Sequence, residues 1–235
     1  MAINKLVFDV ETIGLKFDSL DEVSKELLET RFKRKSKDDE EIELQKERLT
    51  FFPPLSEIVV IGMLNPETQN GVCLYQTRGK IEKTEENKIE YLPFASEKEL
   101  LEKFWQLVMA YEEFITFNGR GFDVPMLLVR SAINDLRPSK NLMVNRYLSS
   151  QPFSLKHIDL QDELGFYGAK NDFLGLHFWT KAFGIESPKS GEMTGDSVGK
   201  NFEEGKFVEI AKYCMGDVFA TSELYKKWDK YLRFS

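Results

Sequence analysis

The sequence has few of the residues that build disulfide frameworks or zinc centres. It contains two cysteines, Cys73 and Cys214, and two histidines, His157 and His177, and the cysteines do not form a CxxC pair. No disulfide scaffold or structural zinc site is therefore indicated. We expect a reducing, cytoplasmic environment and structural or surface roles for both histidines.

Long apolar runs and an excess of basic charge are also missing. No apolar stretch approaches the ~18 residues that a membrane span needs, and the short apolar start ends at Asp9, so neither a membrane span nor a signal peptide is expected. The formal net charge of −7 is unlike that of a module that reads DNA sequence. A metal-dependent nuclease remains possible, because bound cations supply positive charge where phosphate docks.

The composition is otherwise that of a globular domain. The chain has 235 residues, of which 42% are hydrophobic and 19 are phenylalanine, which is ample material for a core. We find no internal repeat and no linker, and we expect a single domain over residues 1–235. Residues 118–158 are locally basic, with six basic and two acidic side chains, and are interpreted either as ordinary helix surface or as a rim that faces phosphate.

The order of hydrophobic patterns predicts an α/β fold with a mixed sheet flanked by helices. Strands are expected at residues 5–12, 57–64, 72–77 and 114–117, with a further short one at 157–160. Helices are expected from Ser96, where Ser96 and Glu99 form a capping box, and at residues 124–136, 161–166, 172–183 and 202–231. Residues 79–90 and 185–200 are predicted to be loops.

Residues 16–57 differ from the rest and are predicted to be a charged helical insertion after the first strand. Between Asp21 and Arg48 we count ten acidic and eight basic residues. Leu20, Val23, Leu27, Leu28 and Phe32 recur at helical spacing, so we expect two helices or one broken helix. The insertion is interpreted as a solvated helical hairpin, with a lid, a substrate guide or a site for a protein partner as the alternatives.

Acidic residues at three places predict a metal centre. Asp9 and Glu11 are two apart on a strand and therefore point to the same side. Asp123 follows the strand at 114–117, and turns after strands are where α/β sheets usually build their sites. Asp217 lies in an otherwise apolar helix, where a carboxylate is costly unless it is paired or binds metal, and Tyr213 lies one turn earlier on the same face.

A site of carboxylates without cysteine or histidine favours hard cations. Mg²⁺ and Mn²⁺ prefer such oxygen ligands. Two such ions can activate a water molecule and stabilise the leaving oxygen of a phosphodiester. A nearby tyrosine could position that water or help to deprotonate it.

These motifs resemble those of the DEDD 3′–5′ exonucleases, a superfamily with a ribonuclease H-like fold. Phe8-Asp9-Val10-Glu11-Thr12 resembles the first motif, and Asn118-x-x-x-Phe122-Asp123 resembles the second in the form used by the exonuclease domain of family B DNA polymerases. Tyr213-x-x-x-Asp217 resembles the third motif of the tyrosine subtype. The histidine subtype does not fit, because Lys212 stands five residues before Asp217.

The resemblance implies a role for each motif residue. Asp9, Glu11 and Asp217 would hold the catalytic metal, and Asp9 with Asp123 a second one, both Mg²⁺ or Mn²⁺. Tyr213 would orient the attacking water, and Thr12, Asn118 and Phe122 would contact the substrate strand near its end. We therefore expect a 3′–5′ exonuclease that releases 5′-nucleotides from single-stranded nucleic acid.

Two alternatives remain open at this point. DNA is favoured over RNA as the substrate, but an RNA exonuclease is nearly as compatible with the sequence. A catalytically silent relative that binds nucleic acid or acts as a scaffold is the second alternative, although every carboxylate of the motifs is present.

Overall fold

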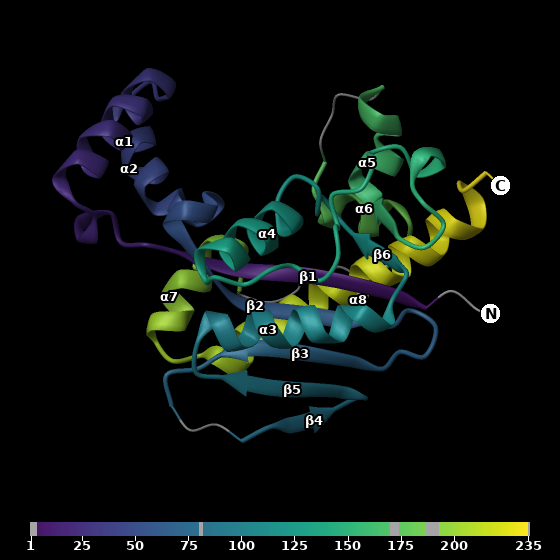
Figure 1. The fold of residues 1–235 in the computed structure, drawn as a ribbon. Coiled ribbons are helices and arrows are strands. Elements are labelled where there is room, and N and C mark those ends of the chain that lie inside the picture. The colour runs from purple at the N-terminus through teal and green to yellow at the C-terminus, as the bar shows by residue number, and fades with distance from the viewer. Residues whose placement is uncertain (1–3, 80–81, 170–173, 187–192, 235) are drawn as a thin grey trace.

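A β-sheet lies at the centre of the molecule. The computed structural model describes residues 4–79, 82–169, 174–186 and 193–234. Within these ranges, seven strands form one mixed sheet in the order β4-β5-β3-β2-β1-β6-β7 (Figure 1). The strands are β1 (Lys5–Gly14), β2 (Ser56–Leu64), β3 (Gly71–Gln76), β4 (Thr84–Glu86), β5 (Ile89–Phe94), β6 (Glu113–Thr116) and β7 (Lys156–Asp159).

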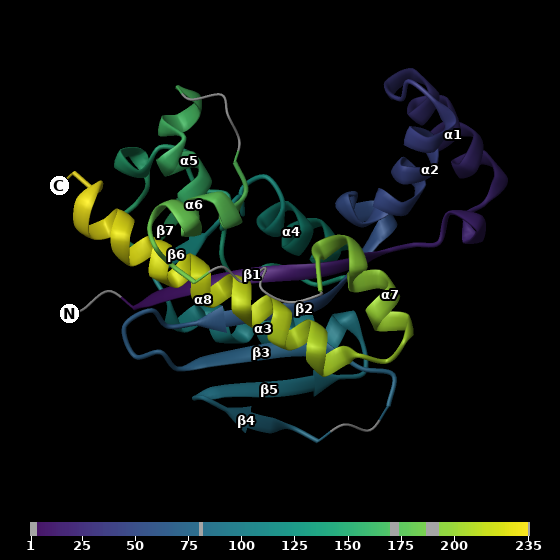
Figure 2. The same ribbon diagram turned by 180° about the vertical axis from the view of Figure 1, so that it is seen from behind.

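Helices cover both faces of this sheet. Those of the described residues are α1 (Glu22–Lys35), α2 (Asp39–Glu47), α3 (Glu97–Leu107), α4 (Asp123–Ile133), α5 (Leu160–Leu164), α6 (Leu176–Ala182), α7 (Val198–Glu203) and α8 (Phe207–Tyr231). Figure 1 shows α3 and α4 in front of the sheet, and Figure 2, from behind, shows the long α8 crossing its other face. This arrangement confirms the predicted mixed α/β sheet flanked by helices. No described helix is long and apolar enough to cross a membrane.

β1 divides the hydrophobic core in two because its side chains alternate between the faces. Leu6, Phe8 and Val10 pack in the core that includes residues of α3 and α4. Val7 packs in the other core, which includes residues of α8. Asp9 and Glu11 share the parity of Val7 and therefore belong to the face that α8 covers.

The predicted insertion forms a projecting helical arm. Its helices α1 and α2 extend from the sheet at the upper left of Figure 1. The apolar stripe predicted for it is only partly buried, since Phe32 is 1% exposed whereas Val23 and Leu27 are 66% and 67% exposed. The regular structure of β2 resumes at Ser56, one residue before the predicted strand start.

Three boundaries predicted from the sequence are wrong. Residues 79–90 are not all loop, because β4 and part of β5 pair antiparallel around Asn87 and Lys88, which both have positive φ. Their strand pattern was hidden because β4 is exposed and polar. Residues 195–203 form a short turn and α7 rather than a loop, and the last helix begins at Phe207 rather than at residue 202. Gly205, with φ +79°, separates α7 from α8.

Other predicted elements are present with shifted ends. The predicted helix 172–183 is observed as α6, and its first two residues lie outside the described residues. Residues 187–192 of the predicted loop also lie outside them. Ser96 caps α3 by accepting the Glu99 N–H, while the Glu99 carboxylate accepts the Ala95 N–H rather than that of Ser96.

Candidate active site

The candidate site begins with two acidic residues inside β1. Asp9 and Glu11 lie opposite Gly62 and Val60 of β2, and the strand continues to Gly14, two residues beyond its predicted end. The register of β1 against β2 shifts between Glu11 and Thr12. Such an irregularity re-aims side chains and is common next to functional sites.

A glycine in β2 lets α8 approach the acidic pair. A Cβ atom at Gly62 would lie 2.8 Å from Val218 Cγ2 and 3.0 Å from Cys214 Sγ. Both are buried residues of α8, whose apolar spacing places them on the sheet. Because Gly62 is the register partner of Asp9, this close packing brings α8 directly against the first acidic residue.

α8 carries three side chains that act on the pair. The thiol of Cys214 lies 3.6 Å from the Asp9 carbonyl oxygen and 3.7 Å from Asp9 Oδ2, to which it donates. The charge of Asp217 raises the pKa values of both Asp9 and Glu11. Tyr213 is partly buried. Burial, followed by the charges of Asp217, Glu11 and Asp9, raises the pKa of its hydroxyl, as expected for residues that face one another.

Asp123 reaches the same place from the start of α4. It is only 2% exposed. Its Oδ1 accepts a hydrogen bond of 2.9 Å from the backbone N–H of Val10, the residue between Asp9 and Glu11. This contact joins residues that are 113 apart in the sequence and fixes the carboxylate beside the pair.

The carboxylates raise one another's pKa values. For Asp9 and Glu11 burial is the main cause, followed by the charges of the neighbouring carboxylates, and both pKa values lie well above the usual range. Burial likewise raises the pKa of Asp123 to about 7, although hydrogen bonds from backbone N–H groups oppose the shift. Gathering these carboxylates in a buried place therefore costs folding free energy. A bound cation would offset this cost because it attracts the charged carboxylates.

Two of the three closest donor groups are carboxylates, the type of ligand that a hard divalent cation prefers. The ligand atoms of Asp9, Glu11 and Cys214 all lie within 4.8 Å of one another. Asp123 and Asp217 act on this group through their charges but are not members of that closest set. Carboxylate oxygens are the ligands that Mg²⁺ and Mn²⁺ prefer, and the Cys214 thiol keeps its proton because burial and the charge of Asp9 raise its pKa.

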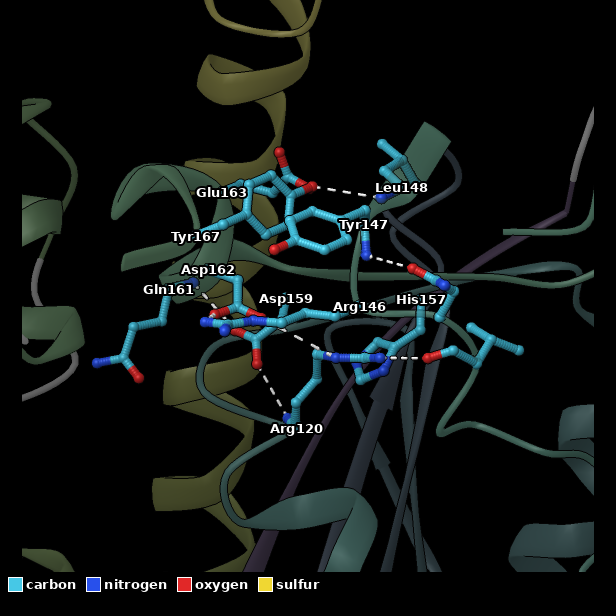
Figure 3. A network of polar contacts seen from close by, with 12 residues as sticks. Arg120, Arg146, Tyr147, Leu148, His157, Asp159, Gln161, Asp162, Glu163 and Tyr167 are labelled. Carbon is cyan, nitrogen blue, oxygen red and sulfur yellow. Dashed lines mark hydrogen bonds and ion pairs between the residues drawn. The ribbon is translucent and has the colours of Figure 1, made fainter. Parts of the chain in front are cut away.

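The turn that carries the second motif is held by a further carboxylate. Asp159, at the end of β7, accepts hydrogen bonds from the backbone N–H groups of Asn118 and Arg120 at 2.8 and 2.9 Å; the contact with Arg120 is seen in Figure 3. Asn118 is exposed and has φ +62°, a conformation that asparagine tolerates better than most residues. Asp159 therefore has a structural role.

His157 also has a structural role, as predicted. It is 2% exposed, and its ring nitrogens lie 2.8 Å from the Thr116 hydroxyl and 3.0 Å from the Leu142 carbonyl oxygen. Burial lowers its pKa to about 3, so the ring is neutral. Figure 3 shows His157 beside Arg120, near the Arg146–Asp162 ion pair.

The remaining predicted substrate contacts, Thr12 and Phe122, both touch one segment at the base of the arm, which the sequence pattern does not mark as part of the site. The Thr12 hydroxyl is 2.6 Å from the Thr50 hydroxyl, and Thr12 is 5% exposed. The ring of Phe122 packs edge-to-face against Phe51, with 5.8 Å between the centroids. Thr50 and Phe51 belong to a 3-10 helix, Arg48–Phe51, at the base of the arm.

Two contributors to the site were missed from the sequence. Gly62 looks like any glycine in a strand, although a strand glycine is a known sign of close backbone approach. Cys214 stands among apolar residues of its helix, which is the pattern of an ordinary core residue. Its position three residues before Asp217, on the same face of the helix, could have indicated that it faces the same surroundings.

A family model described as "Predicted 3'-5' exonuclease related to the exonuclease domain of PolB" matches residues 52–233. The match includes Asn118, Phe122, Asp123, Tyr213 and Asp217, whereas β1 and the arm precede it. No curated protein matches the chain.

Proposed function

The chain belongs to the family of predicted 3′–5′ exonucleases related to the PolB exonuclease domain, and we propose that it removes nucleotides from the 3′ end of single-stranded nucleic acid. Its seven-stranded mixed sheet flanked by helices is consistent with the ribonuclease H-like fold of such exonucleases. DNA is the preferred substrate in this proposal, and 5′-nucleotides are the products. The observation that carries it is the meeting of carboxylates from β1, α4 and α8 beside Tyr213.

The same carboxylates are proposed to hold two divalent cations, Mg²⁺ or Mn²⁺. Asp9, Glu11 and Asp217 would hold one, and Asp9 with Asp123 the other. Cations bound there would supply Lewis-acid stabilisation of the charge that develops on the phosphodiester. The chain's own contribution is to fix the ligands, as the hydrogen bond from Val10 N–H to Asp123 does.

Tyr213 is proposed to orient the attacking water. Burial, and next the charge of Asp217, raise the pKa of its hydroxyl well above the usual value. The phenol therefore stays protonated and can donate or accept a hydrogen bond. This favours a positioning role over removal of the water's proton, the alternative that the sequence left open.

Thr12, Asn118 and Phe122 are proposed to contact the end of the substrate strand. Asn118 is exposed on its turn, which leaves its side chain accessible. In the structure, both the hydroxyl and the carbonyl oxygen of Thr12 are already bonded to Thr50. We also propose that residues 1–235 form one domain with an inserted arm, and that this arm offers a site for a protein partner. The proposed location is a reducing cytoplasm.

An RNA exonuclease is the second candidate, because the same centre would hydrolyse either backbone. End-labelled single strands of DNA and RNA of one sequence, incubated with Mg²⁺, Mn²⁺ or EDTA, test the proposal. We expect shortening from the 3′ end with either metal, none with EDTA, and faster shortening of DNA. Cleavage that persists in EDTA, or release from the 5′ end, would contradict the proposal, and faster RNA shortening would favour the second candidate.

A further inference from the structure

The base of the arm places an accessible aromatic ring next to the second motif. Phe51, the last residue of the 3-10 helix Arg48–Phe51, is 51% exposed. Its ring meets that of Phe122 edge-to-face, at 5.8 Å between centroids and 64° between planes. Phe122 directly precedes Asp123, so the pair of rings lies at the border of the acidic centre.

The residues before Phe51 fix its backbone against β1, the strand that carries Asp9 and Glu11. Thr50 donates a 2.9 Å hydrogen bond to the Thr12 carbonyl oxygen, and its hydroxyl lies 2.6 Å from that of Thr12. A Cβ atom at Gly14 would lie 2.7 Å from the Thr50 backbone nitrogen, so β1 and this segment are in direct contact. Leu49 is fully buried. The segment is thus anchored to β1 just beyond Glu11.

Phe51 is not needed to complete the core. Leu49 and Phe32, which do belong there, are at most 1% exposed. The next ring, Phe52, lies 5.4 Å from the guanidinium of Arg31. Phe51 alone of these presents half of its surface to solvent, on a backbone that its neighbours fix. A half-exposed aromatic ring on a fixed backbone offers a stacking platform for bases.

We propose that Phe51 and Phe122 form a stacking site for an unpaired nucleobase of the strand whose end is held at the acidic centre. The inference rests on the proposed function. It assigns the base of the arm a part in substrate binding, which was one of the alternatives for the insertion. Phe51 immediately precedes residues 52–233, the region that the family model matches, and Phe122 lies within it.

Two properties of the substrate follow from a stacking contact. Every base has an aromatic face, so the site tolerates all base identities. The base must be unpaired and free of its neighbours to enter, which favours single strands over duplex ends. Stacking does not involve the 2′-hydroxyl, so this site contributes equally to DNA and RNA binding.

The test compares Phe51→Ala with Phe51→Tyr, which keeps the ring, and with Phe153→Ala as the matched control. Phe153 is 84% exposed, lies under the Lys156 ammonium, and is outside the proposed site. Binding of a fluorescent single-stranded DNA is measured by anisotropy with Ca²⁺ in place of Mg²⁺, and melting temperatures check that each variant folds. We expect Phe51→Ala to weaken binding by about five- to hundredfold, and the other two variants to bind like the wild type.

Strands with one abasic nucleotide, placed in turn at each position from the 3′ end, locate the contact. At the position whose base stacks on Phe51, the wild type and Phe51→Ala should bind equally. A loss that is the same for every abasic strand, or no loss at all in Phe51→Ala, would overturn the inference. A protein that shows the stacking effect but does not hydrolyse the strand in Mg²⁺ would contradict the proposed function and leave the stacking site intact.

Discussion

Asp123 shows the effect of burying a carboxylate in the folded protein. Its pKa of about 7 in the folded protein exceeds the ~3.9 of an unfolded chain. The stability that its protonated form contributes is therefore fully present below about pH 4 and is lost as the pH rises through 7. In the absence of divalent cations, the protein should be less stable at pH 8 than at pH 5.

Asp123→Asn should remove much of this pH dependence. The asparagine oxygen can still accept the Val10 N–H but carries no charge. Without metal at pH 8 the variant should be more stable than the wild type, by at most about 4 kcal/mol, since three pKa units correspond to roughly 1.4 kcal/mol each. Urea unfolding in EDTA at pH 5 and pH 8 measures the difference, and a variant that is less stable than the wild type at both pH values would contradict the expectation.

A substitution at Tyr213 tests the proposed chemistry of the site. Tyr213→Phe keeps the ring and its packing but removes the hydroxyl. Turnover should fall by roughly tenfold to hundredfold, because the attacking water loses its positioning, while the affinity for the strand should change little. Steady-state kinetics on single-stranded DNA separate kcat from KM, and equal losses in affinity and turnover would argue against the role.

Among the elements, the contact between β2 and α8 decides whether the site forms. Gly62→Ala would place a methyl group 2.8 Å from Val218 Cγ2 and push α8 away from Asp9. We expect a destabilisation of about 1–3 kcal/mol from overpacking and a weaker response of activity to Mg²⁺. Gly199→Ala in α7, where a Cβ would meet nothing within 4 Å, is the matched control and should be neutral or slightly stabilising. Thermal melts and Mg²⁺ titrations of activity compare the two, and equal behaviour would show that the close approach is unimportant.

The elements also show where sequence reasoning works and where it stops. α8 could be predicted because its apolar residues repeat at helical spacing, and β2 because its apolar run is bounded by proline and an asparagine turn. β4 could not, since Thr84–Glu86 is polar and exposed, and its pairing depends on β5, which is itself placed by a parallel contact with β3. The acidic residues of the site could be named from their motifs. The contacts that assemble them, such as Asp123 with Val10 and Gly62 with α8, depend on residues far apart in the chain.

At the scale of the whole molecule, a packed α/β scaffold carries a centre that is electrostatically unfavourable without a bound cation. Ligands that bind only the folded state stabilise it, so Mg²⁺ or Mn²⁺ should raise the melting temperature of the wild type at pH 8. The arm contributes a further group by placing Phe51 against Phe122, next to this centre. An acidic protein with a net charge of −7 would thus bind a polyanion through cations and stacking rather than through a basic surface.

The central claim is that these carboxylates carry out metal-dependent removal of 3′ nucleotides. The most direct measurement is the release of labelled mononucleotide from 3′-end-labelled single-stranded DNA in Mg²⁺ by the wild type, by Asp9→Asn and by Asp18→Asn, an exposed carboxylate outside the site. We expect release by the wild type and Asp18→Asn, and a rate at least about a hundredfold lower for a folded Asp9→Asn, since the metal supplies several kcal/mol. Release by Asp9→Asn at the wild-type rate would contradict the central claim.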